Sequence, residues 1–155
     1  MRAMNAERFE RAWARVRRWW LGAAAPRRGH DAELGRWGEE CAARFLRRQG
    51  YRIVARNVRV RGGEIDLLCV APDDRTIVVV EVKTRLRAPG RTELAASPEA
   101  NVTPDKQRRL SRLAARLAAA NGWTGRPLRI DVVAVERPTD GAPETIRHYE
   151  GITRR

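Results

Sequence analysis

A carboxylate and an ammonium interrupt an otherwise apolar segment, TIVVVEVKTR, at positions 76–85. The β-branched residues of this segment favour a strand, in which side chains alternate between two faces. Glu81 and Lys83 would then point to the same face as Val79, whereas Val80 and Val82 would point to the other. A strand this apolar places two charged side chains together only where a charged partner or a chemical task requires them.

A candidate partner lies in the preceding segment EIDLLCVA at 64–71, which is also strand-like. The intervening PDDR carries strong turn chemistry, so the two segments predict a β-hairpin. A turn centred on Asp73 and Asp74 would place Asp66 directly opposite Glu81. Directly opposed residues have Cβ atoms about 4.5–5.5 Å apart, and two like charges so placed destabilise a sheet. Either one carboxylate takes up a proton, or a cation lies between them.

A divalent cation satisfies this arrangement. Mg²⁺ typically binds one or two carboxylates together with water and phosphate oxygens. Lys83 would lie on the same face as Asp66 and Glu81, where it could orient the attacking water or help to deprotonate it. Such a site is suited to phosphodiester hydrolysis. The alternative is a structural ion-pair cluster of the same three residues. Glu39, at the edge of the buried face of a preceding helix, favours the catalytic interpretation.

The surrounding pattern predicts an α/β fold in the order α-β-β-β-α-β, with a mixed sheet flanked by helices. Asp31 can cap the first helix and Gly50 can end it, and Thr103–Pro104 starts a second helix that ends at Asn121–Gly122. The predicted strands are 51–58, 64–71, 76–85, 128–136 and a weaker 145–152, with a long surface loop at 86–102.

Residues 1–30 are predicted to form an arm, and residues 31–155 the folded domain. Phe9, Trp13, Val16 and Trp20 would form one apolar helical stripe, with arginines opposite. A basic amphipathic helix of this kind can dock on protein, contact nucleic acid or lie on a membrane surface. The sequence leaves the three possibilities open.

The net charge of +13 favours a polyanionic partner, either nucleic acid or an anionic membrane face. The chain has no apolar run long enough to cross a bilayer and no continuous apolar region of a signal peptide. Cys41 and Cys69 form no C-x-x-C pair, and the two histidines have no zinc-site spacing. These features predict a cytoplasmic protein.

Among 32 basic residues, only Lys83 and Lys106 are lysines. The general arginine bias has a simple explanation in nucleotide composition, but the two exceptions can mark places that need a compact ammonium. Other basic or polar residues around the expected cleft could contact phosphates or could merely be solvated. The candidate nucleic-acid-binding residues are Arg56, Arg59, Arg61, Arg85, Lys106 and Gln107. We interpret Asp131 as structural and His148 as an ordinary surface residue.

The spacing of Asp66 from the E-V-K motif resembles the PD-(D/E)xK nuclease superfamily, which includes restriction endonucleases and archaeal Holliday junction resolvases. Over residues 33–136 the sequence is similar to the YraN family of endonuclease-like bacterial proteins. GRWGEECAARFLRRQGYRIVARNVRVRGGEIDLLCVA, VVVEVKTR, TPDKQRRL and RIDVVAV carry this resemblance, and GEIDL with EVKTR is its specific part.

The resemblance implies a restriction-endonuclease-like core and a Mg²⁺ or Mn²⁺ cofactor. It assigns Glu39, Asp66, Glu81 and Lys83 to the active site, with Glu39, Asp66 and Glu81 as metal ligands. Ile65 stands where the superfamily often has proline, and the 86–102 loop is longer than is usual for the family. The basic arm lies outside the resemblance.

Two functions follow from the sequence. The first is a metal-dependent endonuclease acting on DNA, with branched or damaged DNA as candidate substrates. The second is a non-catalytic nucleic-acid-binding module that keeps the nuclease fold. By analogy with resolvases, which cut two strands as dimers, a homodimer is a further expectation.

Overall fold

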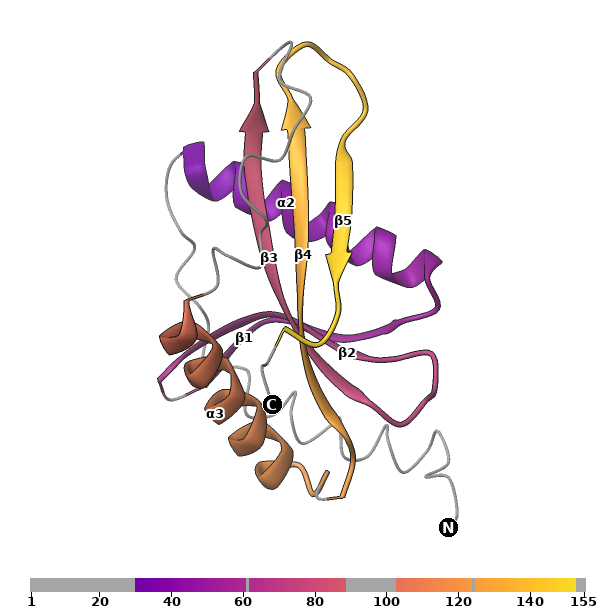
Figure 1. The fold of residues 1–155 in the computed structure, drawn as a ribbon, viewed down its shortest axis with the longest axis vertical. Helices are drawn as coiled ribbons and strands as arrows, with labels where there is room; N and C mark the ends of the chain where they lie inside the picture. Colours follow the sequence, from indigo (N-terminus) through magenta and orange to yellow (C-terminus); the bar gives the residue numbers. More distant parts are fainter. Residues whose placement is uncertain (1–29, 61, 89–102, 124, 153–155) are drawn as a thin grey trace.

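The computed structural model describes residues 30–60, 62–88, 103–123 and 125–152 (Figure 1). The predicted arm, most of the predicted 86–102 loop and Arg61 lie outside the described residues. Within these residues there are seven elements. They are α2 (His30–Arg48), β1 (Arg52–Val60), β2 (Gly63–Val70), β3 (Ile77–Arg87), α3 (Pro104–Ala120), β4 (Leu128–Pro138) and β5 (Thr145–Tyr149).

The strands form one mixed sheet in the order β1-β2-β3-β4-β5. The β3–β4 pair is parallel and the other three pairs are antiparallel. The α3 helix makes the crossover between the two parallel strands, as a parallel pair requires. The predicted α/β class and the predicted order α-β-β-β-α-β are therefore confirmed, and β5 forms the edge of the sheet beside β4.

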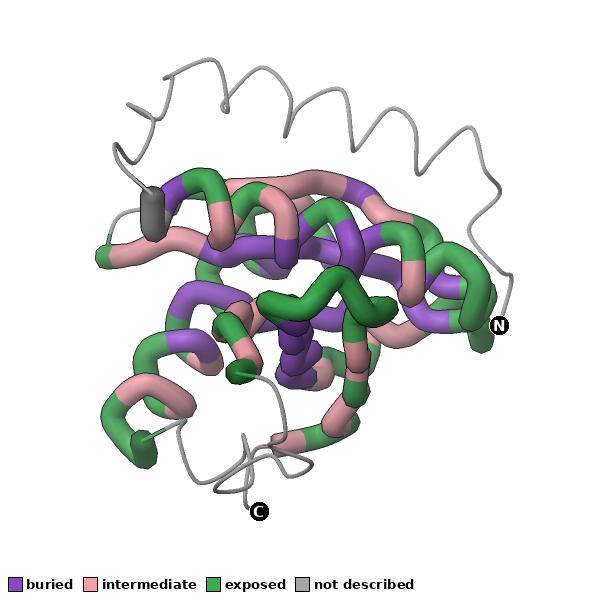
Figure 2. Tube along the Cα trace, turned by 90° about the horizontal axis from the view of Figure 1, so that it is seen from above, coloured by how far each residue is buried: buried purple, intermediate pink, exposed green. Residues whose placement is uncertain are grey.

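The two helices cover opposite faces of the sheet (Figures 1 and 2). Leu110, Leu113 and Leu117 of α3 pack on one face against Leu68 and Val79. A separate cluster on the other face joins α2 to the alternate residues of the same strands. Because successive strand residues alternate faces, the sheet is buried on both sides, and its strands are nearly continuous in apolar residues.

The α2 helix approaches the sheet through small residues. A Cβ atom added to Gly38 would lie 1.8 Å from Oγ1 of Thr84, so only glycine allows α2 to cross β3 at this point. Ala42 and Leu46 are fully buried, while Trp37 and Phe45 are only partly buried. Gly38 and Ala42 thus lie at the centre of the contact, and the larger aromatic residues are less deeply buried beside it. The helix also begins at His30, one residue before the predicted cap position Asp31.

A hydrogen-bond network around the buried Asp131 of β4 links this strand to β5 and to the segment that follows β5. Its carboxylate accepts hydrogen bonds from Arg129 at 2.8 and 2.9 Å, pairs with His148 Nε2 at 2.9 Å, and accepts the Gly151 N–H at 2.9 Å. The structural interpretation of Asp131 agrees with these contacts. The interpretation of His148 as a surface residue is wrong, because its side chain is only 10% exposed and bonds to Asp131.

The Asp131 network predicts a specific pH dependence of stability. Burial raises the pKa of Asp131, but the hydrogen bonds from His148, Arg129 and Gly151 outweigh it and hold that pKa below its ordinary value. A carboxyl with a depressed folded pKa contributes stability that is fully present above the unfolded pKa, about 4, and is lost as the pH falls through the folded pKa. The free energy of unfolding should therefore decline more steeply below pH 4 in the wild type than in Asp131→Asn.

Urea unfolding of both proteins between pH 7 and pH 3 measures this difference. The gap in unfolding free energy should narrow by up to about 1.4 kcal/mol per pH unit. A gap that stays constant across the range would show that the ionised form of Asp131 is not what the network stabilises.

Candidate active site

Glu81 lies where the buried half of β3 gives way to its half-buried end. The carboxylate is almost completely buried, and one of its oxygens, Oε1, receives two ammonium groups. Lys83 Nζ lies 3.1 Å from this oxygen, and Lys106 Nζ from the first turn of α3 contacts it as well. Lys106 was predicted as a phosphate ligand. In the structure both lysines of the chain, Lys83 and Lys106, contact Glu81.

The two lysines differ in their electrostatic environments. Burial is the largest influence on Lys106, and together with the nearby Lys83 it outweighs the hydrogen bond to Glu81 and lowers the pKa of Lys106. Burial also opposes the charged form of Lys83, but contact with Lys106 and the charges of Glu81 and Asp66 prevail and raise the pKa of Lys83. The cluster therefore shifts the pKa values of its two lysines in opposite directions.

We call Glu81, Lys83, Lys106 and Asp66 the Glu81 cluster. Asp66 contacts the backbone of β3 beside Glu81. The predicted hairpin register is confirmed from Val70↔Ile77 to Leu67↔Val80, but the ladder ends there, one step before the predicted Asp66–Glu81 pair. Oδ2 of Asp66 instead accepts the Val82 N–H at 2.8 Å. This hydrogen bond stabilises the charged carboxylate, and the predicted Asp66–Glu81 pair is not part of the β2–β3 ladder.

Glu39 reaches the site region from α2 through Asn57, whose Nδ2 donates to Oε2 of Glu39 at 3.0 Å. Asn57 lies between the pairs Arg56↔Leu67 and Val58↔Ile65, which places it across from Asp66 on β1. Its φ of 51° is in the left-handed region that asparagine tolerates better than most residues. Sequence analysis missed Asn57. An asparagine inside an otherwise strand-like run was the available signal.

The carboxylates fit only one kind of metal site. Among the described residues, no group of three or more histidine, cysteine, aspartate or glutamate side chains is arranged to hold a metal ion. The structure thus does not bring Glu39, Asp66 and Glu81 together as a three-ligand cage. Asp66 and Glu81, both buried and on adjacent strands, match the one or two carboxylates that Mg²⁺ or Mn²⁺ uses when water and phosphate complete its shell.

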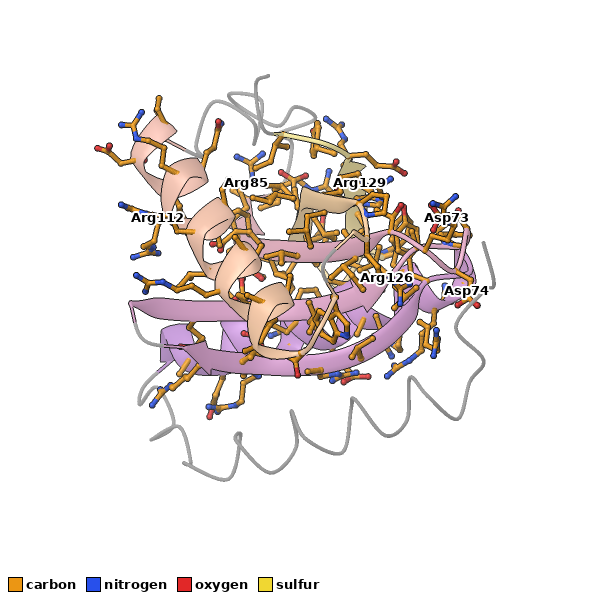
Figure 3. The ribbon with its side chains drawn as sticks, turned by 90° about the horizontal axis from the view of Figure 1, so that it is seen from below. Asp73, Asp74, Arg85, Arg112, Arg126 and Arg129 are labelled. Carbon is orange, nitrogen blue, oxygen red and sulfur yellow. The ribbon has the colours of Figure 1, made fainter. Side chains whose placement is uncertain are left out.

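Three of the four predicted phosphate-binding arginines have carboxylate partners, and the fourth, Arg61, lies outside the described residues. Arg56 pairs with Glu40, and Arg59 Nε lies 3.8 Å from Glu64. Arg85, on the same face of β3 as Lys83, pairs with the buried Glu136 (Figure 3). Gln107 is half-buried, and its backbone N–H donates to Thr103 in the cap of α3. These partners offset the positive charge that phosphate binding would use.

A cavity of about 550 Å³ lies on the other side of the sheet, beside the start of α2. Trp37, Leu86 and Arg137 line it, and the Arg137 guanidinium lies over the Trp37 ring at 5.1 Å from its centroid. No residue of the Glu81 cluster contributes to its walls. The described helices include none that is long and apolar enough to cross a membrane.

Comparison with known proteins places these residues in a family. The model of "Uncharacterised protein family UPF0102" matches residues 38–135, a range that contains Glu39, Asn57, Asp66, Glu81, Lys83 and Lys106. A UPF0102 protein of Symbiobacterium thermophilum is 50% identical over 108 residues, 70% of this chain and 86% of that protein. One of Beutenbergia cavernae is 44% identical over 126 residues, 81% of this chain and 98% of that protein. Another, from Rhodopirellula baltica, is 38% identical over 152 residues, 94% and 88% of the two chains.

Proposed function

This chain belongs to the uncharacterised protein family UPF0102, which is the YraN family, and we propose that it is a metal-dependent endonuclease that hydrolyses phosphodiester bonds in DNA. One observation supports this most directly. Two buried carboxylates, Asp66 and Glu81, lie on the adjacent strands β2 and β3, with the amine of Lys83 3.1 Å from Glu81. Burying two acidic groups is costly, and a site that must bind a cation and a phosphate gives a reason to do so.

In this proposal, Asp66 and Glu81 hold a Mg²⁺ or Mn²⁺ ion. When bound, the ion would neutralise charge on the scissile phosphate and lower the pKa of an attacking water. The Val82 N–H fixes the carboxylate of Asp66. Glu39, held by Asn57, would act from the second layer, since no described three-carboxylate group is present to bind the metal directly.

The two lysines would have different tasks. Lys83 follows Glu81 by two residues on the same strand face, so its amine would lie beside any group held by Glu81 and could orient the water. Although burial opposes its charged form, Lys106, Glu81 and Asp66 raise the pKa of Lys83 in the metal-free protein, so its amine could take the water's proton only where a bound cation offsets the two carboxylates. Lys106 comes from α3 and neutralises Glu81 in the metal-free protein. With a divalent ion held by Glu81, the Lys106 ammonium would no longer be needed to neutralise this carboxylate and could contact the phosphate.

The second candidate function is a non-catalytic nucleic-acid-binding module. It is favoured by the same contacts viewed differently: Lys83 and Lys106 together compensate Glu81 without any metal. In that case Asp66, Glu81 and the lysines would be a structural ion-pair cluster. Homodimer formation, a cytoplasmic location and the role of the N-terminal arm remain predictions.

A nuclease assay separates the two functions. The wild type and Glu81→Gln would be incubated with branched, nicked, single-stranded and duplex DNA, and with single-stranded RNA, in Mg²⁺ or Mn²⁺. We expect the wild type to cleave at least one DNA substrate and Glu81→Gln to lose that cleavage, because the variant removes a metal ligand and keeps nearly the same shape. If neither protein cleaves any substrate but both bind nucleic acid, the binding-module function takes its place.

A further inference from the structure

Both lysines of the chain contact the same carboxylate oxygen. Oε1 of Glu81 lies 3.1 Å from Nζ of Lys83 and also contacts Nζ of Lys106. All the other basic residues among the 32 lysines and arginines of the chain are arginines. The chain therefore uses lysine only at the two positions where an ammonium group contacts Glu81.

An ammonium group makes a different contact from a guanidinium group. It is a compact point charge on a flexible stem, whereas a guanidinium is a planar fork that binds a carboxylate through several N–H groups at once. Arg85 shows the second kind on the same strand, since its Nε and Nη2 both contact the buried Glu136. Each lysine contacts Glu81 through a single nitrogen. Such a contact is easier for another cation to replace.

Of the two lysines, Lys106 is the one that can leave Glu81. Lys83 lies on the same strand as Glu81 and pairs with Ala134 in the β3–β4 ladder, so strand alternation keeps it beside the carboxylate. Lys106 reaches Glu81 from α3, and the residues before it, 103–105, are all exposed. The Lys106 side chain can therefore turn toward solvent while the sheet and the helix backbone stay in place.

The start of α3 gives no local reason for a lysine at position 106. Thr103 caps the helix and accepts the Lys106 N–H, which makes Lys106 the third helical residue after Pro104 and Asp105. A cation near a helix N-terminus is unfavourable because the helix dipole is positive there. Glutamate and glutamine are the residues that a threonine cap favours at this position. The contact with Glu81 accounts for the lysine instead.

The charge of the Glu81 cluster links this contact to metal binding. Its two carboxylates and two ammonium groups leave the cluster neutral when all four are ionised. A divalent ion held by Asp66 and Glu81 would add two positive charges beside both ammonium groups. Like charges placed together in a partly buried site repel one another strongly. Movement of Lys106 away from Glu81 would reduce this repulsion and leave Oε1 to the metal ion.

We propose that Lys106 is the counter-ion of Glu81 that a divalent metal ion displaces, and that this competition sets the metal affinity of the site. The inference rests on the proposed function for the presence of a metal ion, but it does not require cleavage. It makes Lys106 a determinant of metal affinity, whereas Lys83 stays beside Glu81 in both states.

The affinity for Mn²⁺ alone tests the proposal, measured by isothermal titration calorimetry on the full-length, metal-free protein. Lys106→Gln removes the ammonium group, suits the third position of the helix and leaves Lys83 in contact with Glu81. This variant should bind Mn²⁺ about 10-fold more tightly than the wild type, a usual size for coupling between two ligands. Lys106→Arg keeps the charge but offers a fork that is harder to displace, so it should bind Mn²⁺ more weakly than the wild type.

Arg108→Gln is the matched control. It removes one positive charge from the same end of α3, but Arg108 is exposed and pairs with Asp105 instead of Glu81. Because solvent and salt screen exposed charges, this variant should change the Mn²⁺ affinity by less than about twofold. If Lys106→Gln does not fold, Lys106→Met, which keeps an apolar stem, replaces it with the same expected increase.

An unchanged or weaker Mn²⁺ affinity in Lys106→Gln would overturn the proposal. Tighter binding by Lys106→Gln together with wild-type affinity in Lys106→Arg would also overturn it, because the metal would then respond to charge and not to a displaced contact. Tighter binding by Lys106→Gln without any DNA cleavage refutes the nuclease alone. Cleavage by the wild type with no effect of Lys106→Gln on Mn²⁺ affinity refutes the role of Lys106 alone. Absence of Mn²⁺ binding from both proteins refutes both.

Discussion

Replacing Lys83 with arginine should slow DNA cleavage by about 10²–10⁴-fold, the usual cost of losing a general acid–base group. Arginine keeps a positive charge beside Glu81, so the fold, metal binding and DNA affinity should stay close to those of the wild type. It is bulkier, however, and it stays protonated in proteins, so it cannot take a proton from the attacking water. Single-turnover cleavage with saturating enzyme measures the rate of the chemical step. DNA binding measured in the presence of EDTA, which prevents cleavage, gives the affinity of each variant.

Lys106→Arg is the matched control, because it changes the only other lysine, which contacts the same oxygen of Glu81. If Lys106 acts through its charge, this variant should lose much less activity than Lys83→Arg. The reverse result, with Lys106→Arg inactive and Lys83→Arg fully active, would assign the proton transfer to Lys106. Equal activity of Lys83→Arg and the wild type would refute any proton-transfer role for Lys83.

The sheet could be predicted from the sequence because interactions between residues close in the sequence determine it. The Asp73–Asp74 turn sets the register of β2 against β3. Because both faces of the sheet are buried, a shift of this register by one residue would exchange the side chains of the two faces and is disfavoured. The apolar stripe of α3 and its Thr103 cap likewise follow from residues near in sequence. Where short-range chemistry decides, prediction and structure agree within a few residues.

The site was harder to predict because its main contacts join residues that are far apart in the sequence. Nothing in the spacing of Lys106 shows that it reaches across from α3 to Glu81, 25 residues earlier. Nor does strand alternation show that Asp66 would turn its carboxylate to the Val82 N–H and end the ladder. Asn57 breaks the alternation of β1 through a left-handed residue, and a periodic pattern cannot represent that step.

His148 was misread for a related reason. Its strand, β5, is short and has a weak pattern, so the sequence does not indicate which of its side chains face inward. In the structure, His148 pairs with Val133 across the β4–β5 ladder and so faces the same side as Asp131, two residues before Val133. A polar residue on a short edge strand can be interpreted only when its neighbour across the ladder is known.

The metal site itself leads to the other large expected effect, which concerns stability and needs no substrate. Mg²⁺ or Mn²⁺ at 100 times its dissociation constant should stabilise the wild type by about 2.7 kcal/mol, whereas Asp66→Asn should show almost no stabilisation. Asparagine can still accept the Val82 N–H, so the metal-free stability of the variant should remain near that of the wild type. Thermal unfolding with increasing metal measures both quantities.

Asp105→Asn, which removes an exposed carboxylate from α3, is the control and should respond to metal as the wild type does. The same metal response in Asp66→Asn and the wild type would place the ion elsewhere. A large loss of metal-free stability in Asp66→Asn would instead identify Asp66, Glu81, Lys83 and Lys106 as a structural ion-pair cluster, since only a structural carboxylate is missed before any metal is added.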